Sequence, residues 1–98
     1  MTREAALAIL RRQRALLEAR GIAHAAVFGS VARNESGVRS DIDIVVTPTA
    51  GARLDLVDLG GIQTVLDEAF GIDVDVIVEP VGRPELLRAI ERDRANAF

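Results

Sequence analysis

The chain has 98 residues, 49% of them hydrophobic and 3% aromatic, with a formal net charge of −3 and no cysteine. This length is typical of one domain, expected here over residues 1–98, and its core must be aliphatic. The absence of Trp and Tyr argues against stacking on single-stranded nucleic acid, and the absence of cysteine excludes disulfides and thiolate metal sites.

Charge and hydropathy also bear on location and partners. The negative net charge gives no overall attraction to nucleic acid or to an anionic membrane, so any anion must be held by a local site. Residues 1–13 mix Glu and Arg with apolar residues, unlike a signal peptide, and no apolar run approaches the ~18 residues of a membrane helix. We therefore expect a cytoplasmic protein without direct nucleic-acid or membrane partners.

The first half of the chain predicts two helices and two strands. Leucines at helical spacing, with Thr2 as a cap and Gly21 as a stop, indicate an amphipathic helix over residues 2–20. The apolar residues 22–28 predict a buried strand that leads into Gly29. The remaining elements here are a short helix over 30–35, a loop over 36–40 and a second strand over 41–47, which Pro48 ends.

The second half of the chain predicts two more helices around a third strand. Residues 54–70 have a helical pattern, but the Gly60–Gly61 pair predicts a kink or two shorter helices. Residues 72–79 alternate with period two, as in a strand, and Pro84 suits the first position of a last helix. The order α-β-α-β-α-β-α predicts an α+β domain of layered α/β type, with a small mixed sheet of about three strands flanked by helices.

Two aspartates stand at the second strand, where carboxylates are unusual. Side chains at i and i+2 of a strand point to the same face, so Asp41 and Asp43 project together, roughly 7 Å apart, with Ile42 and Ile44 on the opposite face. Their mutual repulsion and any burial disfavour the charged pair. A divalent cation between them would reverse this, and oxygen ligands at this spacing suit Mg²⁺ or Mn²⁺.

The third strand offers a third carboxylate. Asp73 and Asp75 share one face of this strand, so either can join the pair if the two strands are neighbours. Three carboxylates on adjacent strands can hold two metal ions ~3.5–4 Å apart for in-line nucleotidyl transfer.

The Gly29–Ser30 pair predicts the phosphate site. Glycine at a strand end allows the backbone to approach a phosphate closely, and Ser30 adds a hydroxyl at the start of a helix. Arg33, three residues later, can bind phosphate oxygens with its forked guanidinium.

These residues together resemble a known family. The stretch "GSVARNESGVRSDID" resembles the signature of the minimal nucleotidyltransferases of the DNA polymerase beta-like superfamily, in which Gly-Ser, an arginine and Ser-Asp-x-Asp follow one another at this spacing. Asn34 stands where the family usually has glycine, and asparagine tolerates positive φ well. The resemblance extends over nearly the whole chain and favours Asp75 over Asp73 as the third carboxylate.

The resemblance implies a nucleotidyltransferase fold and an activity. Family members transfer AMP from ATP with Mg²⁺, and many are antitoxins that adenylylate a tyrosine of a HEPN-domain toxin. Carried over by position, the catalytic metal ligands are Asp41, Asp43 and Asp75, with two Mg²⁺ ions. The nucleotide-binding residues are Gly29, Ser30, Arg33 and Ser40.

Several alternatives stay open at this point. Arg33 could be a surface residue paired with an acid, and Ser40 could orient its loop through a bond to the backbone. The protein could also be an antitoxin that neutralises a HEPN partner by contact alone, or a nucleotide-binding subunit that needs its partner for activity. The acceptor residue, the nucleobase and the oligomeric state have no readable signature.

Overall fold

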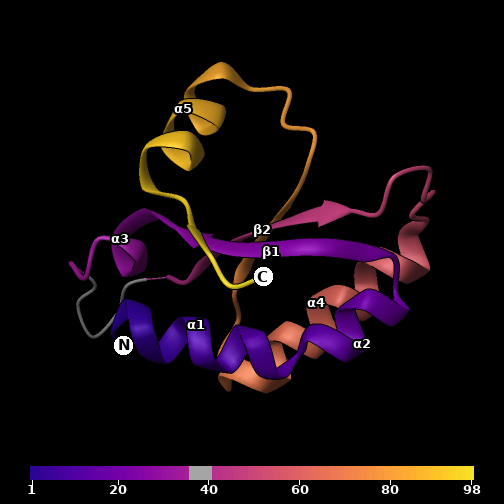
Figure 1. Cartoon of the computed structure of the whole chain (residues 1–98), viewed down its shortest axis with the longest axis horizontal. Coiled ribbons are helices and arrows are strands. Elements are labelled where there is room, and N and C mark those ends of the chain that lie inside the picture. Colours follow the sequence, from indigo (N-terminus) through magenta and orange to yellow (C-terminus); the bar gives the residue numbers. More distant parts are fainter. Residues whose placement is uncertain (36–40) are drawn as a thin grey trace.

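The computed structural model describes residues 1–35 and 41–98 and has helices on both sides of a small mixed sheet (Figure 1). In chain order the elements are α1 (Arg3–Arg12), α2 (Arg14–Ala19), β1 (Ile22–Phe28), α3 (Gly29–Ala32), β2 (Asp43–Pro48), α4 (Leu56–Phe70), β3 (Asp75–Val78), α5 (Pro84–Asp93) and β4 (Ala95–Asn96). The predicted α+β class is confirmed. No helix in these two segments is long and apolar enough to cross a membrane.

The sheet has four strands in the order β3-β2-β1-β4. Strand β1 pairs antiparallel with β2 and β4, and β2 pairs parallel with β3. The strand absent from the prediction is β4, a pair of residues that bonds to Ala26 and Val27 at the far edge. Two residues carry no readable alternation, so this strand is visible only through its long-range pairing.

The two faces of the sheet are covered unequally. Figure 1 shows α1, α2 and α4 together on one face, where the larger core cluster lies, and α5 on the other. The smaller cluster under α5 contains Ala26, Phe28, Val45 and Ile90. The face under α5 is therefore the more open one, and it carries the polar side chains at the ends of the strands.

Two helix predictions need correction. The helix expected over residues 2–20 is divided into α1 and α2 at Gln13, although Thr2 caps it as predicted, accepting a hydrogen bond of 3.1 Å from the Ala5 N–H. The helix α4 runs without interruption through Gly60 and Gly61, so the prediction of two shorter helices is wrong.

The packing of α4 explains why its glycine pair does not break it. Ile62, Leu66 and Phe70 form one buried stripe at helical spacing, and tertiary burial of such a stripe outweighs the propensity cost of glycine. A Cβ on Gly61 would collide with the guanidinium of Arg20. The guanidinium of Arg20, just after α2, thus lies against the backbone of α4 at Gly61.

The strand directions bring three strand ends together. Phe28, the last residue of β1, is the Cα partner of Asp43, the first residue of β2. Asp43 is in turn the Cα partner of Asp75, the first residue of β3. The turn into α3 and the acidic starts of two strands therefore meet at one end of the sheet.

Candidate active site

Three carboxylates gather at this end of the sheet. Asp43 and Asp75 stand opposite each other on adjacent parallel strands, and Asp41 lies two residues ahead of β2. Ile42 and Ile44 are buried beneath them, as the predicted alternation requires. The strand itself begins at Asp43, two residues later than predicted, although the Asp75 N–H already bonds to the Ile42 carbonyl at 2.9 Å.

The structure also separates the two candidates for the third carboxylate. Asp75 is the residue that pairs with Asp43, whereas Asp73 precedes β3 and is exposed. Asp75 is thus the candidate that lies opposite Asp43, and its role as a metal ligand stays a prediction.

Asp43 lies in an electrostatic environment that disfavours its charge. Burial raises the pKa of the Asp43 carboxyl, and the carboxylates of Asp75 and Asp41 raise it further, while the Arg33 guanidinium lowers it. The three carboxylates are therefore close enough to act on one another. Their hard oxygen donors and concentrated negative charge are of the kind that a divalent cation binds. Even so, within residues 1–35 and 41–98 no group of three or more acidic or histidine side chains is arranged closely enough to hold a metal ion.

Gly29 is in direct contact with this acidic centre. It has a φ of +70°, and a Cβ at this position would collide with the Asp43 Oδ2 atom. Both the backbone conformation and the close approach therefore require glycine. The turn after β1 and the carboxylate of Asp43 form one packed unit.

The other predicted phosphate residues lie along and after α3, which spans four residues instead of the expected helix over 30–35. Ser30 is half-buried in its first turn. Arg33 forms ion pairs with Glu35 and with Asp93, whose side chain is 3% exposed. Arg33 thus joins α3 to the end of α5, and its predicted contact with phosphate stays a prediction. Ser40 lies outside the described residues.

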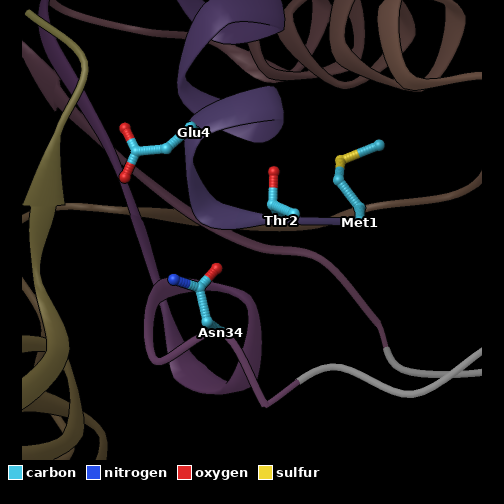
Figure 2. Close-up of a pocket in the computed structure, with 4 residues that line it drawn as sticks. All are labelled: Met1, Thr2, Glu4 and Asn34. Carbon is cyan, nitrogen blue, oxygen red and sulfur yellow. The ribbon is translucent and has the colours of Figure 1, made fainter.

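Asn34, the departure from the family pattern, has a defined structural role. Its φ is +57°, the only positive value among the described non-glycine residues, and its side-chain Oδ1 accepts a hydrogen bond of 2.8 Å from the Arg3 N–H. Figure 2 shows Asn34 across a cavity of about 470 Å³ from Thr2 and Glu4 at the start of α1. The asparagine keeps the turn, as a glycine would, and its side chain also ties α3 to α1, which a glycine could not do.

A polar clamp, not foreseen from the sequence, holds the start of β3. The Asp67 carboxylate accepts a hydrogen bond from the Val74 N–H, and the Gln63 amide donates to both Asp67 and the Val74 carbonyl, all at 2.8–2.9 Å. Both residues are on α4 and face the backbone just before Asp75. The clamp fixes the carboxylate-bearing end of the strand.

A cavity of about 420 Å³ opens beside the carboxylates, within the size range of small-molecule sites. Asp43 and Asp75 line it, together with apolar side chains and with Arg83, which directly precedes α5. Sequence reasoning missed Arg83 because its position depends on how α5 returns over the sheet.

Because the Asp43 carboxylate is held at an energetic disadvantage, the Asp43→Asn variant is expected to be more stable than the wild type. In EDTA at neutral pH its Tm should rise by a few degrees. A raised pKa in the folded state means that this penalty is full above the folded pKa and absent below the usual carboxyl pKa. The gain should therefore disappear in acid. Thermal unfolding of both proteins from neutral pH into acid measures it, and equal Tm values at every pH would contradict the electrostatic account.

The chain is similar to known proteins over most of its length. The family model described as "Nucleotidyltransferase domain" matches residues 10–95. Two Methanocaldococcus jannaschii proteins named "putative protein adenylyltransferase" are similar. MJ0128 is 33% identical over 91 residues, which are 87% of this chain and 87% of that protein. MJ0435 is 44% identical over 57 residues, 58% of this chain and 59% of that protein, so the match spans less than two thirds of its length.

Solved structures show the same fold. A structure titled "putative minimal nucleotidyltransferase" has a TM-score of 0.76 and 30% identity, covering 97% of this chain and 95% of that chain. A toxin–antitoxin crystal structure with AMP-PNP has a TM-score of 0.69 and 20% identity, covering 90% and 72%. A complex of tri-AMPylated Shewanella oneidensis HEPN toxin with MNT antitoxin has a TM-score of 0.65 and 18% identity, covering 94% and 71%.

The family model covers most of the chain, and the alignment with MJ0128 covers most of both proteins. The predicted fold and the predicted enzyme class are confirmed at this level, and this chain belongs to the nucleotidyltransferase domain family.

Proposed function

We propose that this protein transfers AMP from ATP, with Mg²⁺, to a hydroxyl group of a HEPN-domain protein. The observation that carries the proposal is the pairing of Asp43 with Asp75 at one end of the sheet, with Asp41 near them and the Gly29 backbone against Asp43. The names of the relatives, protein adenylyltransferases, support the reaction class. The AMP-PNP in one related structure supports ATP as the nucleotide.

The turn after β1 and the three aspartates would have different roles. Gly29 and Ser30 would bind the triphosphate, because the glycine leaves its backbone open to a close approach and the serine supplies a hydroxyl. Asp41 and Asp43, with Asp75, would hold two Mg²⁺ ions, which when bound neutralise the phosphate charge and lower the pKa of the attacking hydroxyl. The raised pKa of Asp43 supports this assignment, because burial and the two neighbouring carboxylates disfavour its charge and a bound cation would stabilise it.

The transfer itself is a single in-line displacement. The oxygen of the acceptor hydroxyl forms a bond to the α-phosphorus of ATP, the bond from that phosphorus to the bridging oxygen of the β-phosphate breaks, and pyrophosphate leaves. Asp75 is exposed in the cavity, opposite Asp43, and accepts the hydroxyl proton. Asp43 is packed against Gly29, which limits the positions open to its carboxylate.

The test uses ATP labelled at either its α- or its γ-phosphate, together with a purified HEPN-domain protein as the acceptor. Label from the α-position should appear on the HEPN protein with a mass increase of one AMP, and EDTA should abolish it. Label from the γ-position should not appear, because pyrophosphate carries it away. If the HEPN protein is neutralised but never labelled, contact-only neutralisation replaces the proposal.

A further inference from the structure

The cavity beside the carboxylates has an apolar side. Phe28, Ile77 and Leu86 line it, and the same three residues belong to the cluster that packs between α5 and the sheet. This side is continuous with the core under α5, so it is a fixed surface. Asp43 and Asp75 line the same cavity.

Arg83 also lines this cavity and carries a positive charge. It comes directly before Pro84, whose ring fixes the first turn of α5, and the Leu87 N–H bonds to the Arg83 carbonyl at 3.0 Å. Its backbone is therefore well defined. Its guanidinium makes no hydrogen bond or ion pair with any residue in the described part of the chain.

The neighbouring arginines differ from Arg83 in this respect. Arg33 is paired with Glu35 and Asp93, Arg92 with Asp93, and Arg94 with Glu79. Among the described residues, Arg33 lowers the pKa of the Asp43 carboxyl, whereas Arg83 does not contribute to its shift. Arg83 therefore lines the same cavity as the carboxylates, with no ion pair to them, and a ligand in this cavity would meet both.

A bound nucleotide has one part that suits the carboxylates of this cavity and another that suits its apolar residues and Arg83. Its phosphates require the metal-binding carboxylates and the Gly29 turn, whereas its base is planar and apolar on its faces. A guanidinium next to apolar side chains, with no acidic partner among residues 1–35 and 41–98, matches the base, because guanidinium planes stack on aromatic rings without needing such a partner. Phosphate binding by Arg83 is the alternative, and a ligand without a base distinguishes the two.

We infer that Arg83 stacks on the nucleobase of the bound nucleotide and that Phe28, Ile77 and Leu86 form the surface beneath that base. This inference rests on the proposed function and adds a base-binding residue to it. A stacking contact tolerates any base, so it supplies affinity and orientation for a nucleoside triphosphate rather than a choice between purines.

The experiment compares two ligands in calorimetry with Mg²⁺: ATP, and inorganic tripolyphosphate, which has no base. The Arg83→Ala variant is expected to bind ATP about tenfold more weakly and tripolyphosphate as well as the wild type does. The Arg83→Lys variant keeps the charge but not the planar group, so it should recover little of the ATP affinity. Arg88 is an exposed arginine on α5, the helix that Arg83 precedes. The Arg88→Ala variant is therefore the matched control and should bind both ligands normally.

Other outcomes would overturn the inference in distinguishable ways. Equal losses for ATP and tripolyphosphate in Arg83→Ala, restored by lysine, would show that Arg83 binds phosphate. Unchanged ATP affinity in Arg83→Ala would remove Arg83 from the site while leaving the proposed function intact. A wild type that binds neither ligand would remove the proposed function and this inference together.

Discussion

The Asp75→Ala variant is expected to keep most of its ATP affinity and to lose AMP transfer by ~10²-fold or more, the usual contribution of a general base. Asp75 is exposed at the start of β3, where it pairs with the half-buried Asp43. A nucleotide held by its triphosphate at Gly29 and by Asp41 and Asp43 would still bind. Calorimetry with Mg²⁺-ATP and transfer of label from the α-phosphate to the HEPN protein measure the two quantities.

Asp73 provides the matched control for this prediction. It is also an exposed aspartate at the same end of the sheet, but it precedes β3 and has no pairing with Asp43. The Asp73→Ala variant should therefore transfer AMP at close to the wild-type rate. Should Asp73→Ala be the inactive variant and Asp75→Ala the active one, the catalytic register of the third strand would be wrong by two residues.

The parts of the site that could be predicted from sequence are the local ones. The common face of Asp41 and Asp43, with Ile42 and Ile44 buried on the opposite face, follows from the two-residue period of a strand. The turn at Gly29 follows from the conformational freedom of glycine. These features depend on neighbours within a few residues, and short-range pattern is what a single sequence records.

The parts that could not be predicted depend on long-range packing. The placement of Asp75, rather than Asp73, opposite Asp43 depends on the register between β2 and β3. The alternation in β3 alone cannot distinguish the two residues, because they are one strand period apart. Arg83 is brought to the cavity by the path of α5 over the sheet. The pairing of Arg33 with Asp93 joins residues 60 positions apart, so a pattern that predicts a phosphate-binding arginine cannot show the acid that already binds it.

Gly29 connects the conformation of the chain to the proposed chemistry. Its φ of +70° costs an alanine about 1–2 kcal/mol, as in any left-handed position. Its contact with Asp43 is a separate matter, because a Cβ there would displace the carboxylate itself. Gly51 isolates the first effect: its φ is +81°, and a Cβ there would have no atom within 4 Å.

The Gly29→Ala and Gly51→Ala variants should therefore lose similar stability from backbone strain, with a further loss at Gly29 from the collision. Only Gly29→Ala should lose AMP transfer, by ~10²-fold or more, because a shift of about 1 Å in a positioned group has that effect on rate. Urea unfolding and the α-label transfer assay separate the two quantities. If Gly29→Ala folds and transfers AMP as fast as Gly51→Ala, the position of Asp43 against the glycine backbone has no part in catalysis, and the turn serves the fold alone.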